Sequence, residues 1–166
     1  MSKKQMYVHF NPNPKYDEKN ESWPKGDCVI RAIACAMKWS WQKSYMYCVM
    51  HSMKVCDLPN ALEGYRQIME DLNFERVILE NKYKINVENF CKEHNDGIYI
   101  LSVEGISGHV VCCKYGDWYD AFDSGKFLVY GYNKLTRRQP YIRKIPFMLK
   151  FRIMIRRYIR KKFRKN

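Results

Sequence analysis

KGDCVIRAIA, residues 25–34, is the stretch in which a polar loop ends and an apolar helix begins. Apolar residues recur at helical spacing from Val29 to Ala36, so one face of this helix should face a core. Asp27 is a residue type that caps helices, which places Cys28 in the first turn. The unpaired N–H groups and the dipole of a first turn favour a thiolate, although the charge of Asp27 opposes it. The stretch therefore predicts a helix from Cys28 to about Lys38 and makes Cys28 a candidate nucleophile.

Two later stretches carry groups that could work with this thiol. SGHVV, residues 107–111, places His109 at the start of a strand, and YDAFDSG, residues 119–125, ends the next strand at Asp123. A thiol at a helix start, an imidazole on a strand and a carboxylate on the neighbouring strand suit acyl transfer. We expect Cys28 to be the nucleophile, His109 the base and Asp123 the residue that orients His109. The plainer alternatives are a packing thiol, a histidine satisfied within the sheet and a turn aspartate.

The choice of carboxylate depends on the turn between these two strands. A three-residue loop, Tyr115 to Asp117, places Asp123 opposite His109 on one face of the sheet. A two-residue turn at Gly116-Asp117 turns Asp123 away, and Asp120 then becomes the better partner for His109. We expect the three-residue loop, and with it Asp123.

The order of the expected elements indicates an α+β fold, with N-terminal helices packed on a C-terminal antiparallel sheet. Helical periodicity gives way to strand-like alternation after Gly97. In chain order, we expect a strand at 7–10, helices at 28–38, 40–53 (capped by Ser40), 60–72 (capped by Asn60 with Glu63) and 86–94, and strands at 74–79, 98–103, 109–115, 118–123 and 127–132.

The charge is unevenly distributed along the 166 residues, whose net charge is +13. Residues 137–166 hold 13 of the 30 basic residues and no acidic one, which leaves 17 basic against 17 acidic residues in 1–136. We therefore expect a neutral domain at 1–136 and a basic tail at 137–166. Seven scattered cysteines and the lack of an apolar leader favour a reducing, cytoplasmic setting.

The tail predicts a basic amphipathic helix at 146–165, with apolar residues along one arc. Three roles are consistent with this pattern: docking on the domain, binding nucleic acid or another polyanion, and lying on an anionic membrane surface. The basic residues that would contact a polyanion are Lys150, Arg156, Arg157, Arg160 and Lys161.

Three motifs also resemble a known group of proteins. GDCVIRAI (26–33), SGHVV (107–111) and DAFDSG (120–125) resemble small proteins of tailed bacteriophages and prophages that look like compact papain-like cysteine peptidases. More distantly, they are similar to the peptidase domains of bacteriocin-exporting transporters. The resemblance covers residues 11–132. It implies a papain-like fold and a phage-encoded hydrolase in the host cytoplasm, which cuts a peptide, isopeptide or related amide bond.

One departure from that family concerns the oxyanion hole. Papain-like enzymes place a glutamine shortly before the nucleophile, whereas residues 18–27 contain none. Asn20, Asn11 or Asn13 could replace it, with the backbone N–H of Cys28 as the second donor. Because losing one donor typically costs ~10²–10³ in rate, a weak or inactive binding or inhibitory module on the same fold is the alternative.

We expect no cofactor and no metal. Cys91 and His94 lack the second short-spaced ligand pair that zinc sites need. Cys112 and Cys113 are neighbours on a strand, so they should point to opposite faces.

Removal of the tail should separate two properties of the chain. A chain ending between Tyr132 and Arg143 should keep Cys28 reactivity and lose most of its retention on heparin, because phosphate- and sulfate-like attraction follows the number of clustered cations. Thermal melts and heparin elution of the two forms measure this. A shortened chain that is molten or aggregated would show instead that the apolar arc of the tail belongs to the core.

Overall fold

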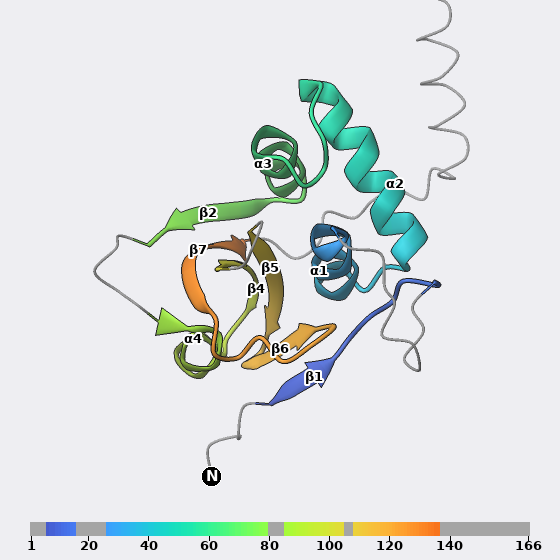
Figure 1. The fold of residues 1–166 in the computed structure, drawn as a ribbon. Helices are drawn as coiled ribbons and strands as arrows, with labels where there is room; N and C mark the ends of the chain where they lie inside the picture. Colours follow the sequence, from blue (N-terminus) through green and yellow to red (C-terminus); the bar gives the residue numbers. More distant parts are fainter. Residues whose placement is uncertain (1–5, 16–25, 80–84, 105–107, 137–166) are drawn as a thin grey trace, which may run out of the picture.

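The computed structural model describes residues 6–15, 26–79, 85–104 and 108–136. They form a seven-stranded sheet with helices on both faces (Figure 1). Within these ranges, no helix is long and apolar enough to cross a membrane. The expected tail helix lies outside the described residues, as do Asn20, Lys150, Arg156, Arg157, Arg160 and Lys161.

The elements follow the expected order, with small changes at their ends. The helices are α1 (Cys28–Met37), α2 (Trp41–Ser52), α3 (Leu62–Asp71) and α4 (Val87–Glu93), and a 3-10 turn, η1 (Met53–Val55), follows α2. The strands are β1 (Tyr7–His9), β2 (Phe74–Ile78), β3 (Ile85–Asn86), β4 (Ile98–Val103), β5 (His109–Lys114), β6 (Asp117–Asp120) and β7 (Leu128–Leu135).

The sheet is mixed rather than wholly antiparallel as we expected. Its order is β1-β6-β5-β4-β7-β2, and the short β3 also pairs with β7. The pairs are antiparallel except for β1 with β6, in which Tyr7 lies beside Trp118 and His9 beside Asp120 in parallel register. The N-terminal strand therefore occupies the sheet edge next to β6, a position that alternation alone does not reveal.

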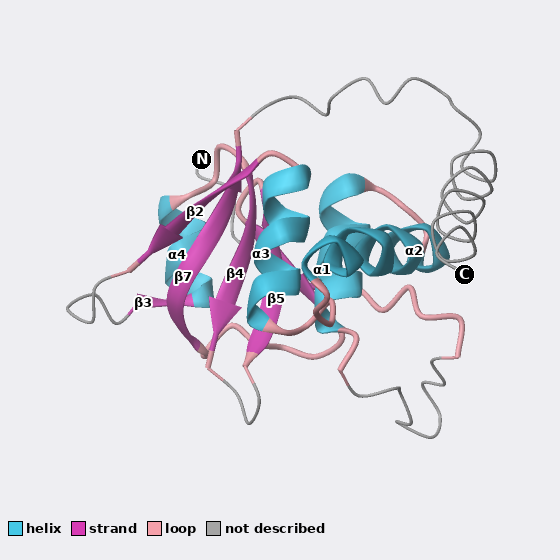
Figure 2. Cartoon of the chain, turned by 90° about the horizontal axis from the view of Figure 1, so that it is seen from above, coloured by secondary structure: helices cyan, strands magenta, loops and turns pink. Residues whose placement is uncertain are grey.

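Two cores lie on opposite faces of this sheet. On one face, α1 packs on the middle strands (Figure 2). On the same face, α2 packs against α1, and α3 packs against α2 and β2. On the other face, α4 covers a second cluster around Phe90 and Tyr99. Consecutive residues of β4 alternate between the two, since Ile100 joins the first core and Leu101 the second. The α+β class is confirmed.

The helix caps agree only partly with the sequence predictions. Ser40 accepts a hydrogen bond from the backbone N–H of Lys43 at 3.2 Å, so the predicted cap of α2 is confirmed. The predicted capping box at Asn60 is wrong, because Ala61 occupies the cap position of α3. The Oδ2 atom of Asp57 serves this helix instead, accepting from the N–H groups of Glu63 at 3.2 Å and Gly64 at 3.1 Å.

Gly64 provides a test of how α3 packs on the loop before it. A Cβ there would lie 2.1 Å from the backbone oxygen of Leu58. Gly64→Ala should therefore lower the Tm by about 3 °C, since overpacking of about 2 kcal/mol outweighs the ~1 kcal/mol gain in helix propensity. Gln67→Ala on the same helix is the control and should change little. A higher Tm for Gly64→Ala would contradict this packing.

Candidate active site

Cys28 is the first residue of α1 and is half-buried. Since α1 packs against β5, the start of the helix meets the beginning of that strand. The backbone of Val110, the second residue of β5, hydrogen-bonds the thiol. The thiol also lies at the helix end where unpaired N–H groups favour negative charge.

Cys28 and His109 shift each other's pKa. Burial alone would raise the pKa of the Cys28 thiol, but a hydrogen bond from His109 and the charge of that imidazole hold it below its ordinary value, with help from Val110 and Arg31. Burial alone would lower the pKa of His109, but the hydrogen bonds and charges of Asp120 and Cys28 raise it to about 9. The surroundings therefore favour a thiolate next to an imidazolium.

The partner that orients His109 is Asp120. Its Oδ2 atom lies 2.6 Å from the Nε2 atom of His109, and its side chain is only 2% exposed. With Nε2 held in this way, Nδ1 is the ring nitrogen left to face the thiol. The Phe122 ring stacks on the imidazole, with the ring centres 5.1 Å apart, and holds it in this orientation.

The turn between β5 and β6 explains why the carboxylate is Asp120. Lys114 pairs with Asp117, so the connection is the two-residue turn Tyr115-Gly116, whose φ angles of 51° and 91° fit a type I′ hairpin. One residue pair further along this register, Val111 lies opposite Asp120, which makes Asp120 a diagonal neighbour of His109 on the same face. The expected three-residue loop is wrong, and our two-residue alternative placed the turn one residue too late.

Asp123 lies beyond the end of β6 and does not contact His109 as we expected. Its Oδ1 atom accepts hydrogen bonds from the indole N–H of Trp118 at 3.1 Å and from the backbone N–H of Gly125 at 3.0 Å. The structure thus brings Cys28 and His109 together and assigns Asp123 to the turn, which was the plainer alternative.

Arg31 is a site residue that the sequence reasoning missed. Its buried guanidinium group pairs with Asp27, the residue just before α1, and its second nitrogen lies 3.7 Å from Oδ1 of Asp120. Asp27 does not cap α1 with its side chain, contrary to our expectation, because its carboxylate also accepts from Asn13 at 2.7 Å and Trp41 at 3.0 Å. The sequence did offer one indication of this ion pair, because Asp27 and Arg31 are four residues apart, the spacing at which side chains meet on a helix.

The candidate oxyanion donors differ in what their amides already bind. The amide nitrogen of Asn13 donates one of its two N–H groups to Asp27. The amide nitrogen of Asn11 is buried and has no hydrogen-bond partner among the described residues, while its oxygen accepts from the backbone of Asn13 at 3.2 Å. Phe10, just before Asn11, donates its N–H to the backbone oxygen of Asp120 at 2.8 Å, so Asn11 leaves the sheet beside the site.

Four other cysteines form two buried pairs on opposite faces of β5. On the face covered by α4, the sulfur of Cys113 lies 2.8 Å from that of Cys91. On the face covered by α1, Cys112 hydrogen-bonds Cys35. The predicted opposite orientation of Cys112 and Cys113 is confirmed. In the described part of the chain, no three His, Cys, Asp or Glu side chains are grouped to hold a metal ion.

The two aspartates should differ in their effect on Cys28. Asp120→Asn keeps the shape of the side chain but removes the charge that raises the pKa of His109. The imidazolium then supports the Cys28 thiolate less well, so the pKa of the thiol should rise by about one unit. Alkylation of Cys28 by iodoacetamide at pH 7 should therefore slow about tenfold. Asp123→Asn, the matched control, should stay within about twofold of the unmodified rate. The reverse order of these rates, measured by mass spectrometry, would exclude Asp120 as the partner of His109.

Comparison with known proteins gives no independent indication of a family. No family model, no curated protein and no solved structure matches the chain. A functional assignment therefore depends on the site geometry described above and on the motifs in the sequence.

Proposed function

We propose that this protein is a thiol-dependent hydrolase with a papain-like arrangement, which cuts a peptide, isopeptide or related amide bond. The observation that carries the proposal is the interaction of Cys28 with His109, whose far nitrogen is held by the buried Asp120 at 2.6 Å. The chemistry requires a nucleophile, a base next to it and a group that orients the base. The resemblance to phage proteins supports a phage-encoded enzyme acting in the host cytoplasm.

The proposed reaction has two steps. The Cys28 thiolate attacks the carbonyl carbon, and the imidazolium of His109 gives its Nδ1 proton to the departing amine, which leaves an acyl-enzyme. His109 then takes a proton from water, the water oxygen attacks the acyl carbon, and the acid product leaves as the thiolate and imidazolium are restored. The backbone N–H of Cys28 and the unused amide nitrogen of Asn11 are the candidate donors to the oxyanion.

A binding or inhibitory module remains the second candidate function. The glutamine typical of the papain-like family is absent, and the amide of Asn13 already donates one hydrogen bond to Asp27. If Asn11 does not reach the oxyanion, the rate falls by ~10²–10³ and partner binding becomes the main property of the fold. The basic tail would then supply affinity for nucleic acid or an anionic membrane surface.

Cleavage of a bacterial lysate tests the hydrolase directly. New protein N-termini, identified by mass spectrometry, should appear with the unmodified chain and be absent with Cys28→Ser. Cys56→Ser is the matched control, because Cys56 is an exposed thiol, and this variant should cut normally. Equal patterns for the unmodified chain and Cys28→Ser would leave the binding module as the better account.

The pH dependence of cleavage should be bell-shaped. Activity should rise as the Cys28 thiol loses its proton, below the ordinary thiol pKa of 9.0, and fall as His109 loses its proton near pH 9. Rates of one cleavage across pH 5 to 10.5 measure both limbs. A rate that keeps rising through pH 10 would show that the imidazolium is not needed.

A further inference from the structure

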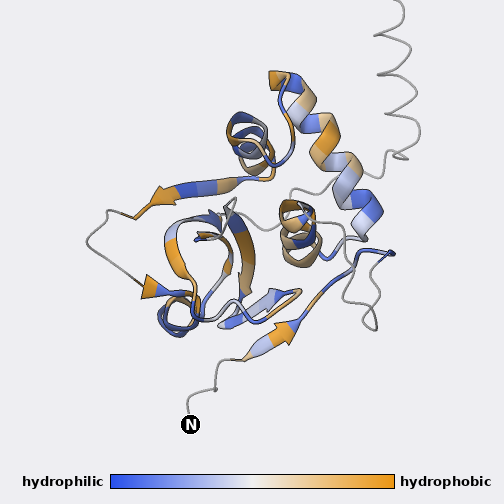
Figure 3. Cartoon of the chain, in the orientation of Figure 1, coloured by the Kyte–Doolittle hydropathy of each residue, from blue (hydrophilic) through white to orange (hydrophobic). Residues whose placement is uncertain are grey.

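On the face of the sheet that carries α1 and α3, a row of strand partners runs from the thiol toward β2. Val110, which contacts Cys28, pairs with Ser102 of β4, and Ser102 pairs in turn with Gly131 of β7. In the adjacent row, Asn133 of β7 pairs with Arg76 of β2. The middle of β2 is accordingly hydrophilic (Figure 3).

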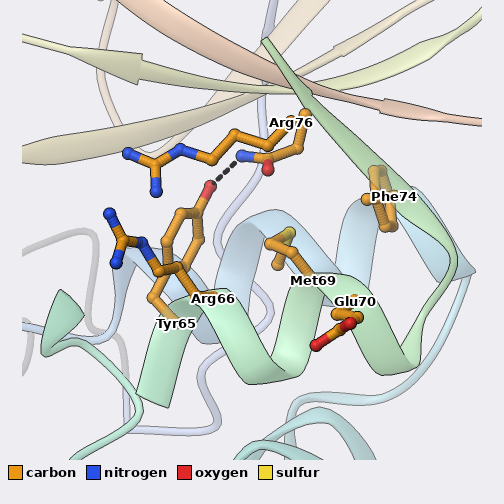
Figure 4. A pocket seen from close by; sticks show the side chains of 7 residues that line it. Tyr65, Arg66, Met69, Glu70, Phe74 and Arg76 are labelled. Atoms are coloured by element: carbon orange, nitrogen blue, oxygen red, sulfur yellow. Dashed lines mark hydrogen bonds between the residues drawn. The ribbon is translucent and has the colours of Figure 1, made fainter. Parts of the chain in front are cut away.

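Two cavities lie over these residues. One cavity, of about 300 Å³, is lined by α3 and by the sheet (Figure 4); the residues are Tyr65, Arg66, Met69, Glu70, Phe74, Arg76 and Asn133. A second, of about 140 Å³, shares Arg76 and Asn133 and continues over Ser102 and Gly131. The two cavities adjoin at Arg76 and Asn133, and we call them together the β2–β7 groove; its lining reaches Ser102 of β4, the strand next to the one that carries His109.

Tyr65 is fixed in the wall of this groove by side chains of the sheet. Its hydroxyl hydrogen-bonds Ser102 and accepts from the amide of Asn133 at 2.7 Å. Ser102 lies opposite Val110, whose backbone hydrogen-bonds the Cys28 thiol. The groove is therefore linked to the nucleophile through neighbouring strands.

Two groups in the groove have unused binding capacity. The amide oxygen of Asn133 has no partner within the described residues, although Asn133 is only 2% exposed. Buried acceptors of this kind are usually paired with an N–H or O–H donor, and the N–H of a bound peptide would serve. Arg76 forms no ion pair with any described residue, whereas Arg66 pairs with Glu63 at 2.6 Å. The groove therefore offers an acceptor for an amide N–H and, beside it, a guanidinium group for a carboxylate.

We propose that the β2–β7 groove binds the acyl side of an extended peptide substrate and selects an acidic side chain through Arg76. This rests on the proposed function, since it assigns the substrate of the same site. From β5 to β2 there are three strand spacings, or about 14 Å. An extended peptide advances about 3.4 Å per residue, so, after allowance for side-chain length, the acidic residue lies about two to four positions before the reacting carbonyl.

Peptidyl chloromethyl ketones test this selection without requiring turnover. Matched reagents with Glu or Gln two, three or four residues before the warhead would be compared by their rates of Cys28 alkylation in the full chain. One position should favour Glu by about three- to fivefold, the size of a partly exposed ion pair. Arg76→Gln should abolish the preference, whereas Lys92→Gln, which removes one charge from α4, should keep it.

Iodoacetamide separates failure of this inference from failure of the proposed function. It is too small to need the groove, so Arg76→Gln should leave its rate unchanged. Normal iodoacetamide labelling with no Glu preference, or with a preference that survives Arg76→Gln, would overturn the groove assignment alone. Failure of both reagents to label Cys28 would overturn the hydrolase and this inference together.

Discussion

The buried guanidinium group of Arg31 joins the elements of the site. It pairs with Asp27 at the start of α1 and approaches Asp120 at the end of β6, and both carboxylates are more than nine-tenths buried. Removing one partner of such a buried pair typically costs about 3–5 kcal/mol, because the other charge is left uncompensated. The position of Cys28 relative to His109 therefore depends on this cation, although Arg31 itself touches neither the thiol nor the substrate in the proposed reaction.

The same arrangement explains how a half-buried thiol can ionise. Asp27 lies next to Cys28 and its negative charge would oppose a thiolate, but its carboxylate is neutralised by Arg31 and bound by Asn13 and Trp41. Asp120 is in turn committed to His109, whose imidazolium compensates the thiolate. Each charge therefore has a nearby opposite charge, which is the condition for keeping ionised groups away from water.

Much of the fold and part of the site could be predicted from the sequence. Helical spacing located α1, and a histidine after Ser107-Gly108 correctly indicated the start of β5. The choice between Asp120 and Asp123 failed because it depends on a one-residue register, and both alternatives placed Asp117 in the turn, whereas Asp117 pairs with Lys114. Tyr115 takes a positive φ of 51°, which is uncommon for a bulky residue, so the local sequence gave little warning of a Tyr-Gly turn.

Other features depend on long-range contacts that no local pattern reveals. The parallel pairing of β1 with β6 joins residues more than 100 positions apart, and it brings Asn11 beside the site. The β2–β7 groove likewise combines α3 with strands from both halves of the sequence. Arg31 could be read as a surface residue of an amphipathic helix, whereas residues 29–37 of α1 are all buried.

Titration of the Cys28 thiolate tests the central claim most directly. Thiolate absorbance near 240 nm, measured against pH as the difference between the unmodified chain and Cys28→Ala, isolates this thiol from the other six cysteines. The account predicts a midpoint below the ordinary thiol pKa of 9.0, which moves upward in His109→Ala. A midpoint at or above 9.0 that His109→Ala leaves unchanged would contradict the thiolate–imidazolium pair.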